Sequence, residues 1–302
     1  MIVRIIKRIA PAPLVGWLKD RRRDVRRQRW RWSVTGGDTK LLTVQDLAQD
    51  LRDLGVEPGR DLVAHSSLSS LGLVDGGAET VIAALRDVIG DDATLLMPTY
   101  PIQMTMLEEM RSGTPFDVRE TPSRMGKISE VFRLLPDTLR SAHPTHSVAA
   151  QGPKAAFYTE GHHQVGTPCG PGSPLHLLAN NGGQILCLGC LVGHATSTHI
   201  IEDLVDNFPV NVYLAGSLSR PVRFADGHTE EVATRVHDPA LAPIRIDNHP
   251  PKEAEIAEEM RRRGILKEGA VGKAHCYLFR SADFVAMFAD LAKQGRTIYA
   301  TD

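Results

Sequence analysis

The sequence predicts an α/β fold with a largely parallel sheet. Two short apolar runs, residues 61–65 and 94–98, are separated by a glycine-rich turn and an amphipathic helix that begins near Ala78 and ends at Gly90. Strands joined through a helix pair in parallel, because a tight hairpin would reverse the chain direction. A third apolar run, residues 184–190, is bounded by glycines and is typical of a strand buried on both faces.

Helices are expected where apolar residues recur every three or four positions between capping residues. Residues 42–55 show this pattern, with Thr43 as the cap, Leu47 and Leu51 on one face, and Gly55 as the stop. The same criteria predict helices at residues 121–135, 174–179, 252–263 and 282–294.

The remaining strands are assigned from β-branched and apolar runs bounded by turn residues. They are expected at residues 148–151, 210–214, 220–224, 231–236 and 272–279. Asp226-Gly227 is a typical hairpin turn between two of these strands. Residues 40–302 therefore read as one domain, which follows an arm of residues 1–39.

The composition is that of an ordinary globular protein, with 42% hydrophobic and 24% charged residues among 302. No run approaches the roughly 18 apolar residues of a membrane-spanning helix, and the N-terminus lacks the features of a secretory signal. Four cysteines in a chain of this length do not indicate a disulfide framework. A cytoplasmic location is expected.

The N-terminal arm is strongly basic. Residues 1–32 hold eleven Lys and Arg against two Asp, interspersed with Ile, Leu and Trp. Such a segment fits peripheral contact with the inner membrane surface, or packing on a partner subunit in a homodimer. Nucleic-acid binding is not expected, since no recognition fold accompanies the charge.

Cys187 and Cys190 have the spacing of a metal or redox pair, but they lie in an apolar strand and no second pair completes a site. A role in the core is favoured.

The stretch after that strand carries the strongest candidate site. His199 and Glu202 are three residues apart on a predicted helix capped by Thr196 or Ser197, and Asp203 lies four residues from the histidine. This spacing places a carboxylate beside the imidazole on one helical face. The end of a strand is also where α/β proteins place their chemistry. A structural histidine beside a surface carboxylate is the alternative.

A second polar stretch precedes the strand at residues 148–151. It contains Arg140, Ser141, His143, His146 and Ser147. The two histidines are three apart around a proline, so they are either metal ligands or part of a polar binding loop. The binding loop is favoured, because helical spacing is unavailable here.

Several segments, in this order, resemble the antibiotic N-acetyltransferase family, which includes the aminoglycoside 3-N-acetyltransferases. They are HSSLSSLGLVDGG with MPTY, TPSRMG, RSAHPTHSVAAQGP, and CGPGSPLHLL leading to STHIIED. The resemblance runs from about residue 42 to 295. It implies a three-layer α/β/α fold with a central mixed, mostly parallel sheet, distinct from the other large acetyltransferase superfamily.

The resemblance also implies acetyl-coenzyme A as co-substrate, a small-molecule amine as acceptor, and no metal. His199 is then the general base that takes a proton from the acceptor ammonium, with Glu202 or Asp203 holding its tautomer. Coenzyme A is expected at a set of residues drawn from three segments: His65, Ser66, Ser67, Leu68 and Ser69; Met125 and Gly126; and Arg140, Ser141, His143 and Ser147. Backbone amides at 66–68 are candidate oxyanion donors.

The acceptor is expected near further residues of these segments: Asp75, Tyr100, His146, Cys169 and Asp203. Direct transfer in a ternary complex is favoured over a covalent acetyl-Cys169 intermediate. Residues 232–238, VATRVHD, place arginine and histidine where relatives often present acidic residues. This departure, together with the basic arm, leaves open an amino sugar of surface-polysaccharide biosynthesis as the acceptor instead of an aminoglycoside antibiotic.

Two readings from other classes remain. A metal-dependent hydrolase would use His143, His146 and His199 with a carboxylate, and would contain stoichiometric zinc. A catalytically silent module would act only through membrane docking of residues 1–32.

Overall fold

The computed structural model describes residues 40–102 and 105–301, and the chain from Leu42 to Asp302 forms one compact unit. The predicted arm, residues 1–39, lies outside the described residues. No helix in the described part is long and apolar enough to cross a membrane.

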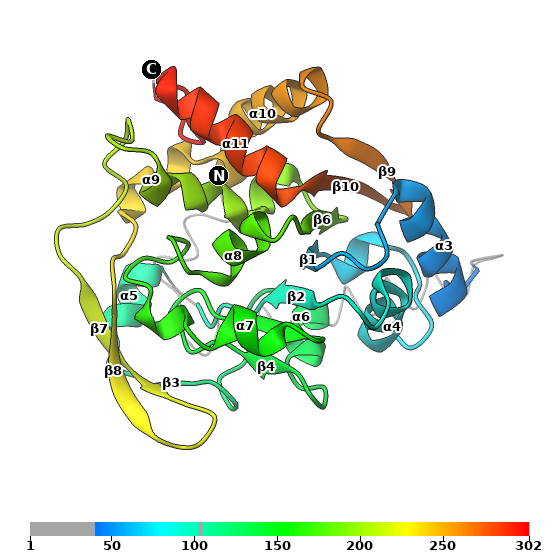
Figure 1. Cartoon of the computed structure of the whole chain (residues 1–302), viewed down its shortest axis with the longest axis horizontal. Coiled ribbons are helices and arrows are strands. Elements are labelled where there is room, and N and C mark those ends of the chain that lie inside the picture. Colours follow the sequence, from blue (N-terminus) through cyan, green and yellow to red (C-terminus); the bar gives the residue numbers. More distant parts are fainter. Residues whose placement is uncertain (1–39, 103–104, 302) are drawn as a thin grey trace, which may run out of the picture. The chain divides into compact units, whose positions relative to one another are not determined.

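A seven-stranded sheet with the order β4-β5-β2-β1-β6-β10-β9 forms the centre of this unit (Figure 1). Strands β2, β1 and β6 pair in parallel, whereas β5 and β10 run antiparallel to their neighbours. Five of the seven strands thus share one direction, and the sheet is mixed and mostly parallel. Its strands are β1 (Leu62–Ser66), β2 (Leu95–Pro98), β4 (Leu139–Arg140), β5 (Val148–Gln151), β6 (Gln184–Leu188), β9 (Lys267–Val271) and β10 (Ala274–Arg280).

Helices cover both faces of the sheet. Alternate residues of a strand point to opposite faces, so their side chains pack into two separate cores. Leu62 and Ala64 of β1 belong to a core shared with α3 (Val44–Leu54), α4 (Ala78–Ile89) and α6 (Lys127–Phe132). Val63 belongs to the opposite core. That core includes residues of α7 (Ala155–Thr159), α8 (Pro174–Asn180), α9 (Ile201–Leu204), α10 (Pro250–Arg262) and α11 (Ser281–Lys293). The predicted three-layer fold is confirmed.

A second, three-stranded sheet is formed by β3 (Phe116–Asp117), β7 (Leu218–Arg223) and β8 (Thr229–Thr234). It lies apart from the large sheet in Figure 1. Gly227 has a φ of 94° in the turn between β7 and β8, as the Asp-Gly hairpin prediction requires.

Local sequence accounts for several element ends. Thr43 accepts a hydrogen bond from the Asp46 amide and forms a capping box at the start of α3, and Gly55 ends that helix with a left-handed φ of 97°. Gly189 directly follows β6, and a Cβ at this position would come within 2.8 Å of the Ser70 Cβ. This close approach admits only glycine.

Three predicted elements are wrong. Residues 210–214 form only one bridge, between Tyr213 and His237, and do not extend it into a ladder. The helix predicted at 121–135 begins only at Lys127, since Gly126 has a φ of 109°. The helix of His199 is a 3₁₀ turn, η4 (Thr196–Ile200), followed by the single turn of α9, and neither Thr196 nor Ser197 caps it. Strands β3, β4 and β9 and helices α5 (Met106–Arg111) and α7 were not predicted.

Candidate active site

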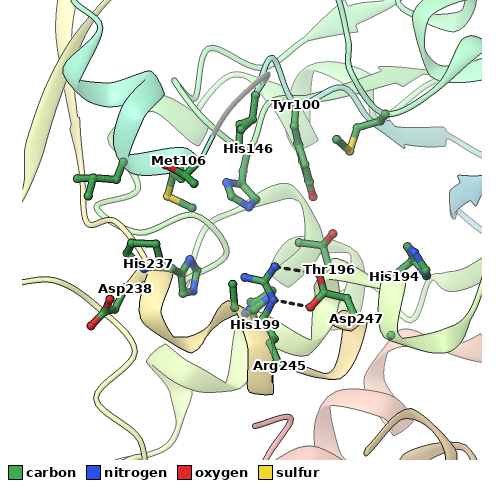
Figure 2. A pocket seen from close by; sticks show the side chains of 17 residues that line it. Tyr100, Met106, His146, His194, Thr196, His199, His237, Asp238, Arg245 and Asp247 are labelled. Carbon is green, nitrogen blue, oxygen red and sulfur yellow. Dashed lines mark hydrogen bonds and ion pairs between the residues drawn. The ribbon is translucent and has the colours of Figure 1, made fainter. Parts of the chain in front are cut away.

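A pocket of about 470 Å³ opens beyond the carboxyl ends of β2 and β6, the edge of the sheet where α/β proteins bind ligands (Figure 2). The predicted residues Tyr100, Met125, His146 and His199 all line it. Further lining residues are His194, Thr196, His237, Asp238, Arg245 and Asp247.

The His199 imidazole is held by Glu202 from behind the pocket wall. Its Nδ1 lies 2.7 Å from Glu202 Oε1, and the carboxylate has no solvent exposure. Burial alone would raise the pKa of Glu202, but the interactions of its carboxylate with His199 and His237 outweigh burial and hold this pKa well below its usual range. An ionised carboxylate only accepts, so Nδ1 carries the proton and Nε2 keeps a free lone pair.

Two further residues bind the same carboxylate, and neither was predicted as a site residue. His237 Nε2 lies 2.7 Å from Glu202 Oε2, and the Tyr299 hydroxyl donates to Oε1 at 2.7 Å. Tyr299 is 97 residues from Glu202 along the chain and stands in no recognisable motif. His237 was noticed only as a departure from relatives. The bridge between Tyr213 and His237 positions it here.

On the opposite wall, Tyr100 and His146 pack together with ring centroids 4.4 Å apart. Burial, together with the neighbouring His237 and His199, lowers the pKa of His146 well below its ordinary value, so this imidazole is neutral. Burial likewise raises the pKa of Tyr100. Neither ring adds charge to the pocket.

The pocket charge comes from Asp238, Asp247 and Arg245. Arg245 donates to both oxygens of Asp247, Nε to Oδ1 at 2.6 Å and Nη2 to Oδ2 at 2.9 Å (Figure 2). The side-chain hydrogen bond to Asp247 raises the pKa of Arg245 despite its burial. One of the two carboxylates is therefore neutralised by a cation within the pocket.

The loop that carries Arg140 differs from its expected role in binding coenzyme A phosphates. Arg140 donates to the backbone carbonyls of Val118, Thr121 and Thr99, and its guanidinium lies over Phe116. Burial lowers its pKa to about 9. These donors are occupied by the protein itself, so Arg140 ties loops together and is not a free phosphate ligand.

The serine side chains of this loop and His143 Nδ1 are also occupied, whereas His143 Nε2 is buried without a hydrogen-bond partner among the described residues. Ser141 Oγ accepts from the Val148 amide, and Ser147 Oγ donates to the Thr99 carbonyl. His143 accepts from the backbone amide of His146 and stacks on His162. The side chains of Ser141, His143 and Ser147 are buried and expose no surface for the contacts with coenzyme A that were expected of them.

The turn after β1 retains features that suit a ligand. Ser66 Oγ and His65 Nε2 are buried and have no hydrogen-bond partner among the described residues. Ser67 Oγ accepts a hydrogen bond from Ser70 Oγ and also lies close to Ser69 Oγ. A 3₁₀ turn begins at Leu68. The Ser67 amide donates to the Leu188 carbonyl, so one of the three predicted oxyanion donors is already used. Gly126 approaches this turn, because a Cβ there would lie 3.8 Å from the Ser66 carbonyl oxygen.

Three residues expected near the acceptor do not line the pocket. Asp75 is exposed in the turn before α4. Asp203 accepts a hydrogen bond from the Tyr213 hydroxyl at 2.9 Å, and the carboxylate hydrogen-bonded to His199 is that of Glu202. Cys169 is buried, and burial together with Glu202 and Asp203 raises the pKa of its thiol well above the ordinary value. The thiol is therefore not a nucleophile here.

The ligand set of the hydrolase alternative is not assembled in the described part of the chain, since neither His143 nor His146 belongs to a cluster of metal-ligating atoms there. Among the described residues, the metal-ligating atoms that gather within 4.8 Å of one another belong to His199, Glu202 and His237. In the structure these atoms form the hydrogen bonds given above.

The layered sheet therefore carries, at its strand ends, a pocket lined by an imidazole that a buried carboxylate holds. Residues 63–293 match the family described as aminoglycoside 3-N-acetyltransferase, and the chain belongs to this family. Aminoglycoside N(3)-acetyltransferase III of Serratia marcescens is 33% identical over 258 residues, which cover 81% of this chain and 94% of the relative. Aminoglycoside N(3)-acetyltransferase VII of Streptomyces paromomycinus is 34% identical over 258 residues, 79% of this chain and 87% of the relative.

Solved structures agree. AAC-IIIb in its binary complex with CoASH superposes with a TM-score of 0.73 at 27% identity, covering 87% of this chain and 100% of that one. AAC-VIa bound to sisomicin gives a TM-score of 0.72 at 27% identity, with the same coverage. The family predicted from the sequence is confirmed.

Proposed function

We propose that the protein transfers the acetyl group of acetyl-coenzyme A to a primary amine of an aminoglycoside or amino-sugar acceptor, with His199 as the general base. The observation that carries the proposal is the His199–Glu202 pair, whose free Nε2 belongs to a residue lining the pocket. Family membership, a relative bound to CoASH and another bound to sisomicin support it.

The chemistry requires one proton acceptor at the amine. Near pH 7 an acceptor amine is protonated and has no lone pair. His199 Nε2 takes that proton, the freed nitrogen attacks the thioester carbonyl, and the carbon–sulfur bond breaks to release the coenzyme A thiolate. The imidazolium gives its proton to the departing thiolate. The second proton, which the attacking nitrogen loses when it becomes an amide, passes to the neutral His199 and on to solvent. Glu202 stabilises the imidazolium by charge and by the hydrogen bond to Nδ1.

The turn after β1 fits the co-substrate. Pantetheine is rich in amide donors and acceptors, and Ser66 Oγ and His65 Nε2 are buried polar atoms without partners among the described residues. Met125 lines the pocket, and Gly126 stands beside the turn. We assign coenzyme A to this turn and to Met125-Gly126, and not to the side chains of the Arg140 loop.

A second acceptor class is favoured by the Arg245–Asp247 pair. Because Arg245 neutralises Asp247, the pocket offers less negative charge to a polycation than its two carboxylates suggest. An amino sugar with one ammonium group needs less negative charge in the pocket than a polycation does. Acetylation of an amino sugar in surface-polysaccharide biosynthesis is therefore the alternative function.

Acetyl-coenzyme A consumption, measured as thiol release against aminoglycosides and amino sugars, tests the proposal. Aminoglycoside-dependent release that is lost in His199→Ala supports the main function, whereas release only with amino sugars supports the alternative. No release with any acceptor, although coenzyme A binds, would refute both acceptor classes. Activity that a chelator abolishes and zinc restores would support the hydrolase reading instead.

Residues 1–32 are proposed as a peripheral anchor to anionic membrane, on their sequence alone. Co-sedimentation with anionic vesicles should be lost when these residues are deleted. Loss of a dimer in solution, without any change in vesicle binding, would instead assign them to a partner subunit. If deletion abolished vesicle binding while the wild type transferred no acetyl group and His199→Ala changed no measurable property, the silent docking module would be correct.

A further inference from the structure

The Glu202 carboxylate is shared by two imidazoles, and the catalytic proposal uses only one of them. His199 binds Oε1 through Nδ1, and His237 binds Oε2 through Nε2, each at 2.7 Å. The two rings lie close together, with centroids 4.8 Å apart. Both histidines line the pocket, whereas Glu202 is buried behind them.

A carboxylate held at one oxygen can rotate about its last bond, but a carboxylate held at both cannot. Tyr299 and His199 fix Oε1, and His237 is the one side chain among the described residues that donates to Oε2. We infer that His237 is a positioning residue, which locks the plane of the Glu202 carboxylate and thereby keeps His199 in its Nδ1–H tautomer for proton abstraction. This inference rests on the proposed function of His199.

His237 performs this role as a neutral donor. Burial lowers its pKa, and the nearby Glu202 carboxylate only partly offsets that effect. A cation at this position would neutralise Glu202 and weaken its support for the imidazolium that forms on His199. A neutral N–H donor fixes the carboxylate and leaves its charge available to His199.

The surroundings of His237 do not supply a substitute donor to Oε2. The titratable groups that face it come from four other segments of the chain: His199 and Glu202, His146, Tyr213, and Arg245. Tyr213 donates to Asp203 and Arg245 donates to Asp247, so both are committed elsewhere.

Two substitutions of His237 distinguish the effect of its hydrogen bond to Glu202 from the effect of side-chain size. In His237→Gln the side-chain amide nitrogen takes the place of Nε2 and still donates to Glu202, whereas in His237→Asn the amide reaches only to the place of Nδ1. We expect kcat for acetyl transfer to fall by about tenfold in His237→Asn and to recover in His237→Gln, with the acceptor KM within about twofold in both. The exposed His228→Gln is the control for the substitution itself.

A measurement without substrate keeps this inference separate from the proposed function. The ¹⁵N shifts of His199 in the free protein report its tautomer. We expect the Nδ1–H form in the wild type and in His237→Gln, and a mixture in His237→Asn.

An unchanged His199 tautomer with wild-type kcat in His237→Asn would overturn the inference. So would equal losses in His237→Gln and His237→Asn, since bulk alone would then explain them. If the wild type transfers no acetyl group but its His199 tautomer still depends on His237, the proposed function fails and the positioning role stands. Should His237→Asn not fold, Tyr299→Phe, which leaves Oε2 held, must retain the Nδ1–H form.

Discussion

At the scale of single residues, the site depends on one buried charge. Glu202 has no solvent exposure, yet it accepts hydrogen bonds from His199, His237 and Tyr299. A buried carboxylate is tolerated only when its lone pairs are satisfied in this way. The arrangement fixes where a proton resides before any substrate binds.

Replacing Glu202 by Gln keeps the shape of this side chain and removes its charge. The amide no longer stabilises the imidazolium formed at His199, so kcat should fall about 100-fold or more. Steady-state thiol release measures the loss, with the exposed Glu160→Gln as the control. A Glu202→Gln enzyme with wild-type kcat would show that the charge is not used.

Burial of Cys169 leads to a prediction about the reaction route. Its thiol has a raised pKa and does not line the pocket, so it cannot compete with a direct transfer. The intact mass of the enzyme after incubation with acetyl-coenzyme A alone should show no acetyl group on Cys169. Stoichiometric acetylation of this thiol would instead support the covalent route.

At the scale of elements, sequence spacing predicted the contact between His199 and Glu202 but not the structure that supports it. Three-residue spacing brings the two side chains together equally well on a 3₁₀ turn and on an α-helix, so the contact was predicted although the helix type was wrong. His237 and Tyr299 come from segments 35 and 97 residues away from Glu202. No local pattern encodes such distances.

The loop of Arg140 shows the opposite case. Its residue types suggest a phosphate site, but in the structure the Arg140 guanidinium donates hydrogen bonds to the backbone carbonyls of Val118, Thr121 and Thr99. A basic side chain in a polar loop has the same sequence signature whether it binds a ligand or the protein. Only the tertiary structure separates the two.

Arg140→Lys tests this structural role. Lysine cannot reproduce the planar fork of donors, so the free energy of unfolding should fall by about 2 kcal/mol or more. The affinity of the folded variant for coenzyme A should change less than about twofold. Denaturant unfolding and calorimetric titration measure both, with the exposed Arg52→Lys as a control expected to cost under about 1 kcal/mol. A large loss of coenzyme A affinity without a loss of stability would restore the phosphate role.

At the scale of the whole molecule, the fold was predictable because parallel strands and their helices repeat along the chain. The strand at residues 148–151 and the helix from Ala78 to Ile89 agree with the structure, and β1, β2 and β6 differ by at most two residues at either end. The edge strand β9 was missed, because its alternation is weak and it contains Gly269.

Five buried histidines make the stability of the whole domain dependent on pH. Burial lowers the pKa of His65 and of His162 to about 3, and lowers those of His143, His146 and His237. In the unfolded chain each titrates near 6.5, so below that pH the unfolded state binds more protons and stability falls. Each group contributes up to about 1.4 kcal/mol per pH unit.

Thermal unfolding between pH 7.5 and 5.5 checks this expectation. Tm should be constant at the upper end and drop by on the order of 10 °C by pH 5.5. Carboxyl groups contribute little in this window, since their unfolded pKa values lie near 4. A Tm that stays level down to pH 5.5 would mean that these histidines are protonated, and hence solvated, in the folded protein.

The most direct measurement of the central claim is the single-turnover rate of acetyl transfer by His199→Ala, with acetyl-coenzyme A bound and an aminoglycoside acceptor in excess. Removing a general base while the pocket stays intact should slow this step by about 100-fold or more, with an unchanged Kd for acetyl-coenzyme A. A His199→Ala enzyme that transfers acetyl at the wild-type rate would contradict the assignment of His199 as the base.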